Sequence, residues 1–81
     1  MSTRVWIVDD DRAVRFVLAA ALREAGHAVD AFGSAADALE ALAARGAPDL
    51  LFTDVRMPGD DGLQLLARLK ARAPAVLATS V

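Results

Sequence analysis

Apolar positions follow two different periods along the chain, and each change of period marks a new element. Residues 4–8 (Arg-Val-Trp-Ile-Val) form a short β-branched and aromatic run that predicts a buried strand. Apolar residues then recur at the spacing of one helix face, and Gly26 follows where a left-handed residue ends a helix. We therefore predict an amphipathic helix over residues 12–25, with an inward stripe of Val14, Val17, Leu18, Ala21, Leu22 and Ala25.

The alternation of strand and helix continues through the middle of the chain. Residues 28–32 predict a second strand, and Ser34 and Asp37 have the spacing of a variant capping box. We expect the helix that they open to end at Gly46 and to bury Ala38, Leu39, Leu42 and Ala43. Residues 50–53 are an uninterrupted apolar run, which is typical of a central strand covered on both faces.

The last part of the chain predicts one more helix and one more strand. Residues 54–61 predict a loop, because Pro58 and Gly59 interrupt them. A third helix should stop before Pro74, with an apolar face of Leu63, Leu65, Leu66 and Leu69, and residues 75–79 predict a fourth strand. The order β-α-β-α-β-α-β predicts an α/β domain with a parallel sheet, because parallel neighbours need helical, right-handed crossovers.

Composition restricts the class of protein. The 81 residues allow one domain, and 56% apolar against 25% charged residues excludes a disordered chain. The absence of cysteine excludes disulfides and thiolate metal sites, and no uncharged apolar run is long enough to span a membrane. A net charge of -2 with scattered basic residues argues against direct nucleic-acid binding. We expect a cytoplasmic domain without a membrane partner.

Four carboxylates follow predicted strands. Asp9, Asp10 and Asp11 come after the first strand, and Asp54 comes after the third. The carboxyl ends of parallel strands share one edge of the sheet, so these groups converge if the two strands are neighbours. Converging carboxylates repel one another unless a cation neutralises them, and a site with only oxygen ligands suits Mg²⁺.

The isolation of Asp54 suggests a different role from that of the acidic run. A carboxylate beside a metal can attack phosphorus and form an acyl phosphate, so Asp54 is the candidate nucleophile and Asp9 and Asp10 are the candidate metal pair. The alternatives are helix capping for the acidic run, above all for Asp11, and a turn role for Asp54. Arg15 lies near the acidic run but mostly off the apolar stripe, which predicts a solvated side chain.

Two motifs together resemble the receiver domain of bacterial two-component response regulators. They are residues 5–11 (Val-Trp-Ile-Val-Asp-Asp-Asp) and residues 54–59 (Asp-Val-Arg-Met-Pro-Gly), with Asp-Gly at 61–62. The Trp in the first strand, Val-Leu at 17–18 and the Arg-Met-Pro-Gly loop look most like the NtrC-type activators. The resemblance implies a flavodoxin-like doubly wound sheet, with strand order 2-1-3-4 for the part present.

The resemblance also implies roles for individual residues. Asp54 would accept a phosphoryl group from a sensor histidine kinase, and Mg²⁺ would be held by Asp9, Asp10, Asp54 and the backbone carbonyl of Arg56. Thr79 would contact the phosphoryl group, with Ser80 as the alternative. Such a protein is not an enzyme with substrate turnover, and it would control transcription through an output domain.

The family's receiver continues with a further helix, strand and helix, and the strand carries a lysine. We therefore expect residues 1–81 to be a partial receiver domain in which Lys70, on the third predicted helix, cannot replace that lysine. The fourth strand would then be an uncharged sheet edge, which predicts a homodimer or a domain-swapped oligomer.

Two alternative functions remain open at the level of sequence. One is a self-associating assembly or folding module that is not competent for phosphorylation. The other is a haloacid-dehalogenase-like phosphatase, because Asp9 and Asp11 form an Asp-x-Asp motif, although Arg12 and Ala13 do not continue that family's pattern.

Overall fold

The computed structural model describes residues 3–53, 61–72 and 77–80. The elements alternate as predicted: β1 Arg4–Val8, α1 Arg12–Glu24, β2 Ala28–Phe32, α2 Ala35–Arg45, β3 Leu50–Thr53, α3 Asp61–Arg72 and β4 Leu77–Ser80. The fourth strand thus includes Ser80, one residue beyond its predicted end, and the first residues predicted for it lie outside the described ranges. The predicted loop after β3 also lies outside them, apart from Asp61, which begins α3.

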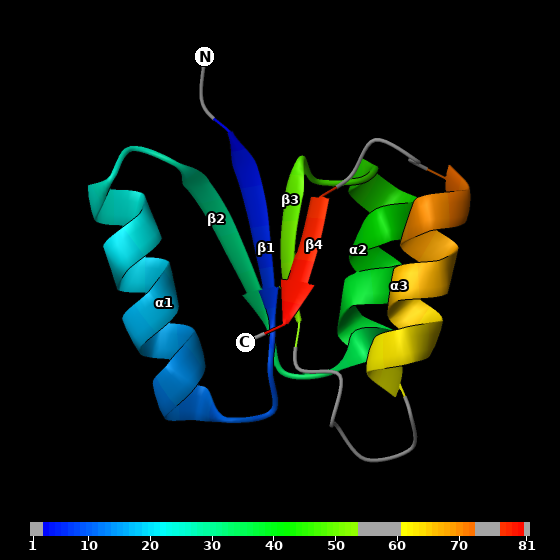
Figure 1. Cartoon of the computed structure of the whole chain (residues 1–81), viewed down its shortest axis with the longest axis horizontal. Helices are drawn as coiled ribbons and strands as arrows, with labels where there is room; N and C mark the ends of the chain where they lie inside the picture. Colours follow the sequence, from blue (N-terminus) through cyan, green and yellow to red (C-terminus); the bar gives the residue numbers. More distant parts are fainter. Residues whose placement is uncertain (1–2, 54–60, 73–76, 81) are drawn as a thin grey trace.

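The strands form one parallel sheet in the order β2-β1-β3-β4 (Figure 1). Val8 at the end of β1 pairs with Phe32 of β2 on one side and with Thr53 of β3 on the other. Helix α1 covers one face of the sheet, and α2 and α3 cover the other (Figure 1). The predicted doubly wound α/β fold is confirmed, and so is the contact between the first and third strands.

The larger core lies between the sheet and the α2–α3 pair. Trp6 is almost fully buried there, and its ring meets that of Phe32 edge-on with centroids 5.0 Å apart. The burial of Trp6 agrees with the buried strand that the sequence predicts over residues 4–8. The buried residues of this core are Trp6, Val8, Ala35, Ala38, Ala41, Leu42, Leu51, Leu65 and Leu69.

Helix α2 begins as predicted but turns a slightly different face inward. The Ser34 hydroxyl accepts a hydrogen bond from the Asp37 N–H at 3.2 Å, and Gly46 ends the helix with a φ of 81°. Ala43, predicted to face the core, is exposed, whereas Ala35 and Ala41 are buried. The buried face of α2 therefore consists of Ala35, Ala38, Ala41 and Leu42, and it is rotated away from Ala43 relative to the predicted face.

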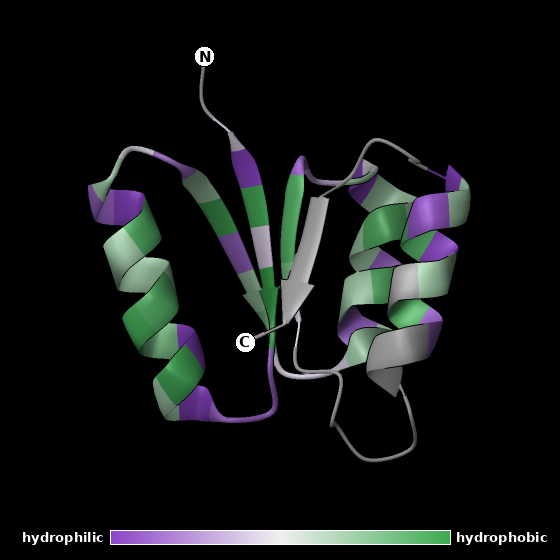
Figure 2. Cartoon of the chain, in the orientation of Figure 1, coloured by the Kyte–Doolittle hydropathy of each residue, from purple (hydrophilic) through white to green (hydrophobic). Residues whose placement is uncertain are grey.

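The smaller core lies under α1, and here the predicted stripe is wrong in part. Val17, Ala21 and Ala25 are exposed, while Ala19 is buried and Leu18 packs against the smaller core. That core consists of Val5, Ile7, Ala19 and Val29. In Figure 2, green hydrophobic positions cover much of the lower half of α1, so apolar residues on this helix are not confined to the face that packs against the sheet.

Helix α1 is rotated about its own axis relative to the orientation that the apolar pattern predicts. At 100° per residue, the face that α1 turns to the sheet is centred on Arg15, Ala19 and Leu22, about a quarter turn from the predicted stripe. Helix α1 lies mainly over β2 and β1. Consequently Phe16 and Val17 remain 75% and 64% exposed, and β3 is only half covered on this face, at Leu50 and Phe52.

None of the helices in the described ranges is both long and apolar enough to cross a membrane.

Candidate functional site

Three aspartates, Asp9–Asp11, join β1 to α1, and we name this segment the acidic turn. Asp9 is the first residue after β1 and is only 4% exposed. Its backbone N–H donates to the carbonyl of Phe32 at 3.1 Å, and its carbonyl accepts from the Arg15 Nη1 at 2.7 Å. Both backbone groups of Asp9 are therefore held by other parts of the chain.

The three carboxylates of the acidic turn have different surroundings. The Asp11 carboxylate accepts from the N–H groups of Ala13 at 2.8 Å and Val14 at 3.2 Å, which makes Asp11 the N-cap of α1. The Asp9 Oδ1 accepts from the Asp11 N–H at 2.8 Å, and Asp10 is exposed. Capping thus accounts for Asp11, and Asp9 and Asp10 remain as candidate ligands.

The buried Asp9 carboxylate forms no ion pair with any basic group in the described ranges. Arg15 is near, but its guanidinium donates to the Asp9 carbonyl rather than to the carboxylate. A buried carboxylate is normally stabilised by a cation or a metal. Two carboxylates at one sheet edge, with no nitrogen or sulfur ligand, match the preference of Mg²⁺ for oxygen.

The remaining predicted site residues fall partly outside the described ranges. Asp54 and Arg56 lie outside them, although Asp54 follows directly on Thr53, the partner of Val8. Within the described ranges, no group of three carboxylate, histidine or cysteine side chains is close enough to hold a metal ion. The structure therefore places Asp9 and Asp10 at the end of β1, and their convergence with Asp54 stays a prediction.

The register of β4 bears on the predicted phosphoryl contact. Thr79 pairs with Phe52, and Ser80 pairs with Thr53. Ser80 is therefore level with the last residues of β1 and β3, and Thr79 stands one step further back along the strand. Both residues stay candidates.

Thr53, the last residue of β3, lies next to the candidate site, and it is not among the site residues predicted from the sequence. It is 2% exposed, and its hydroxyl has no hydrogen-bond partner among the residues that the structure describes. The available signal was a single polar residue at the end of an apolar strand, directly before Asp54.

The pattern of residues 5–81 matches the sequence model of one family, described as the response regulator receiver domain. The chain belongs to this family. The receiver is also similar to the DNA-binding transcriptional regulator NtrC of Escherichia coli K12, with 51% identity over 70 residues. That match covers 86% of this chain and 15% of the relative, so the chain spans a small part of the curated relatives that it matches.

Solved receiver structures have the same fold. The apo receiver domain of nitrogen regulatory protein C matches with a TM-score of 0.82 and 44% identity, covering 96% of this chain and 62% of that one. The beryllofluoride-activated NtrC receiver domain matches with a TM-score of 0.81 and 42% identity, covering 100% of this chain and 64% of that one. The resemblance to NtrC-type receivers is thus confirmed in sequence and in structure.

Family membership and geometry together disfavour the phosphatase alternative. A phosphatase that uses Asp9 and Asp11 as an Asp-x-Asp motif needs a free carboxylate at Asp11. That carboxylate instead accepts hydrogen bonds from backbone N–H groups at the start of α1. Receivers are phosphorylated signalling domains of two-component response regulators rather than enzymes that turn over a substrate.

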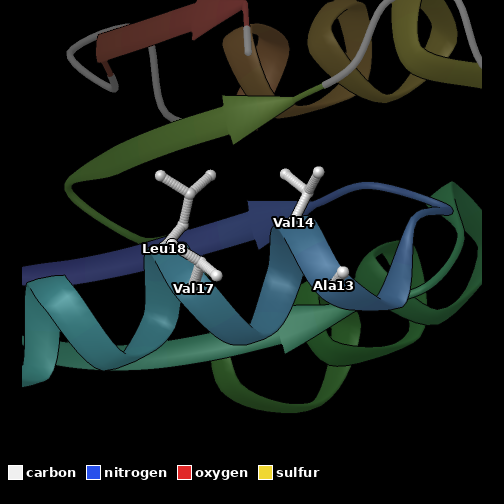
Figure 3. A pocket seen from close by; sticks show the side chains of 4 residues that line it. All are labelled: Ala13, Val14, Val17 and Leu18. Atoms are coloured by element: carbon white, nitrogen blue, oxygen red, sulfur yellow. The ribbon is translucent and has the colours of Figure 1, made fainter.

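The receiver also has an apolar groove, but its lining is unsuited to binding a metal ion or a phosphoryl group. It has a volume of about 360 Å³ and is lined by Ala13, Val14, Val17 and Leu18 of α1. Figure 3 shows Val14 and Leu18 extending from α1 toward β3. The groove offers no polar atom to a ligand, so the acidic turn remains the candidate site.

Proposed function

We propose that this receiver is a cytoplasmic domain and that it accepts a phosphoryl group on Asp54 from the phosphohistidine of a sensor histidine kinase. The observation that carries the proposal is the pairing of Val8 with Thr53, because Asp9 and Asp54 are the next residues along these two neighbouring parallel strands. Two further observations support the phosphoacceptor role. The chain belongs to a family of phosphorylated domains, and the buried Asp9 has no ion-pair partner in the described ranges.

The proposed metal is Mg²⁺, held by Asp9, Asp10, Asp54 and the backbone carbonyl of Arg56. The buried carboxylate of Asp9 and the oxygen-only donor set fit such a cation. When bound, Mg²⁺ offsets negative charge on the phosphoryl group during transfer.

The transfer itself uses a side chain of the receiver as the nucleophile. A carboxylate oxygen of Asp54 attacks phosphorus, a P–O bond forms, and the P–N bond of the phosphohistidine breaks with its electron pair left on the imidazole. The product is an acyl phosphate on Asp54, so the domain is modified once rather than turning over. The hydroxyl of Thr79, or of Ser80, would donate to a phosphoryl oxygen.

The consequence of phosphorylation would lie in an output domain. The relative from Escherichia coli is a DNA-binding transcriptional regulator, and we propose that this receiver likewise controls transcription through an attached domain. That residues 1–81 form one part of a receiver unit stays a prediction.

Self-association is a second candidate function, and two observations favour it. Phe16 and Val17 expose a large apolar surface on α1. In the described ranges β4 pairs with β3 alone, which leaves it at the sheet edge. A homodimer or a domain-swapped oligomer would cover these surfaces.

Beryllofluoride with Mg²⁺ tests the phosphoacceptor role, because it mimics a phosphoryl group on a carboxylate. Trp6 is the only tryptophan, and it packs against Phe32, whose carbonyl binds the Asp9 N–H. We expect its fluorescence to change in the wild type and in Asp11→Asn, since asparagine still caps a helix. Asp54→Asn should show no change, and an equal response in Asp54→Asn would contradict the proposal.

A further inference from the structure

We propose that Arg15 is a positioning residue that holds the acidic turn in its metal-binding conformation, and that Gly33 leaves the space its guanidinium needs. This inference rests on the proposed Mg²⁺ site at Asp9 and Asp10. It concerns an arginine that carries no ligand atom for the metal.

The first argument is the position of Arg15 within α1. Arg15 is half-buried on the face that α1 turns toward the sheet, in line with the buried Ala19. An arginine at such a position needs a polar partner, and the Asp9 carbonyl at 2.7 Å supplies it. The bond is short and charge-assisted, which places it among the stronger hydrogen bonds.

The second argument is what this bond fixes. The Asp9 carbonyl and the Asp10 N–H belong to one planar peptide unit, so holding the carbonyl orients that whole plane. The Asp9 N–H is already held by Phe32, and the Asp9 Oδ1 by the Asp11 N–H. Without Arg15, the peptide between the two candidate ligands loses the only hydrogen bond that a side chain in the described ranges donates to it.

The third argument is the space above Gly33, between β2 and α2. A Cβ on Gly33 would lie 3.2 Å from the Arg15 Nη1, which is tighter than most Cβ contacts, and 3.5 Å from its Cζ, which is an ordinary van der Waals contact. The φ of Gly33 lies outside the left-handed region, so the backbone itself accepts any residue. Contact with the guanidinium is therefore the main obstacle to alanine at this position.

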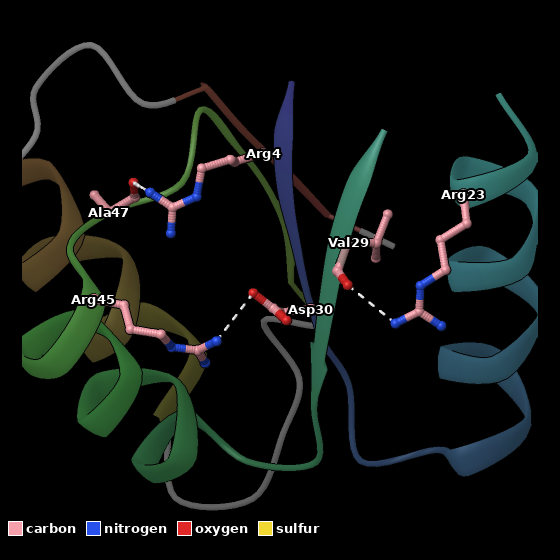
Figure 4. Close-up of polar contacts among 6 residues, drawn as sticks. All are labelled: Arg4, Arg23, Val29, Asp30, Arg45 and Ala47. Carbon is pink, nitrogen blue, oxygen red and sulfur yellow. Dashed lines mark hydrogen bonds and ion pairs between the residues drawn. The ribbon is translucent and has the colours of Figure 1, made fainter. Parts of the chain in front are cut away.

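Arg23 provides a matched control at the other end of the same helix. Its Nη2 donates to the Val29 carbonyl at 3.0 Å, from α1 to β2 (Figure 4). Both arginines reach a backbone carbonyl six residues away, but only Arg15 reaches the acidic turn. Replacing Arg23 removes a similar bond without touching the site.

The sign of the effect separates positioning from simple electrostatics. Arg15 places a positive charge beside the proposed cation, so charge alone predicts tighter Mg²⁺ binding when Arg15 is neutralised. Loss of positioning predicts the opposite, because residues that orient metal ligands typically change affinity by about tenfold or more.

The test is an NMR titration of the 81-residue chain with Mg²⁺ alone, following the amides of Asp9, Asp10 and Asp11. We expect Arg15→Gln to weaken Mg²⁺ binding about tenfold. Arg15→Lys, which retains a donor, should recover part of that loss, and Arg23→Gln should match the wild type. Unchanged or tighter binding in Arg15→Gln would overturn the proposal.

Gly33→Ala tests the same contact from the other side. It should weaken Mg²⁺ binding in the wild type and have no further effect in the Arg15→Gln background, because its only clash is then absent. Equal effects in both backgrounds would contradict the role given to Gly33.

Hydrogen exchange separates a failure of this inference from a failure of the proposed metal site. The Asp11 amide, which donates to the Asp9 Oδ1, should exchange faster in Arg15→Gln than in Arg23→Gln without any metal. If the wild type does not bind Mg²⁺, the proposed metal site is wrong, and the exchange rates still decide whether Arg15 holds the turn.

Discussion

Asp9 combines two properties that rarely occur together, since it is a carboxylate and it is 4% exposed. Its single side-chain hydrogen bond in the described ranges comes from the Asp11 N–H. The amide oxygen of an asparagine can also accept that bond, and it carries no charge. The residue is thus poorly suited to stability alone and well suited to binding a cation.

Asp9→Asn should therefore change how Mg²⁺ affects stability. Without Mg²⁺, we expect the variant to be more stable than the wild type by about 1–3 kcal/mol, because the wild type buries a charge that no cation neutralises. Added Mg²⁺ should raise the free energy of unfolding of the wild type and leave that of the variant unchanged. Urea unfolding with and without Mg²⁺ measures both, and a less stable variant in the absence of Mg²⁺ would contradict this account.

Helix α1 shows where prediction from sequence succeeds and where it stops. Local periodicity predicted all seven elements, and the motifs predicted the acidic turn, because both depend on residues close in the chain. Arg15 is half-buried on the side of α1 that faces the sheet, where it donates to the Asp9 carbonyl, whereas an apolar pattern counts an arginine as a polar interruption. Thr53 was missed for a similar reason, since its burial comes from packing between strands and helices.

Leu18 and Val17 test the observed orientation of α1. Leu18 packs against the smaller core, whereas Val17 is 64% exposed. We expect Leu18→Ala to lower the free energy of unfolding by about 1–3 kcal/mol, less than a fully buried leucine would lose. Val17→Ala should change it by less than about 0.5 kcal/mol. Equal losses in urea unfolding would favour the stripe predicted from the sequence.

At the scale of the whole molecule, cover on the two sheet faces is unequal. Helices α2 and α3 bury Trp6 and Leu51 on one face, while α1 alone leaves Leu50 and Phe52 half-covered on the other (Figure 1). The exposed Phe16 lies on this same helix. The exposed apolar surface of α1 and the sheet edge at β4 are the two surfaces that the proposed association would cover.

Leu77→Lys tests the proposed association through β4. A charge on an edge strand opposes strand pairing, so we expect the variant to have a lower average mass than the wild type in light scattering at the same concentration. Asp54→Asn should associate like the wild type. A folded wild type with a monomer mass at every concentration would rule the association out.

The central claim is that Asp54 accepts a phosphoryl group with the help of Mg²⁺ at the acidic turn. The most direct measurement is intact mass spectrometry after incubation with a small phosphoramidate, whose P–N bond resembles that of phosphohistidine. We predict one added phosphoryl group in the wild type with Mg²⁺, little without Mg²⁺, and none in Asp54→Asn. An unmodified wild type, or equal modification of Asp54→Asn, would contradict the account.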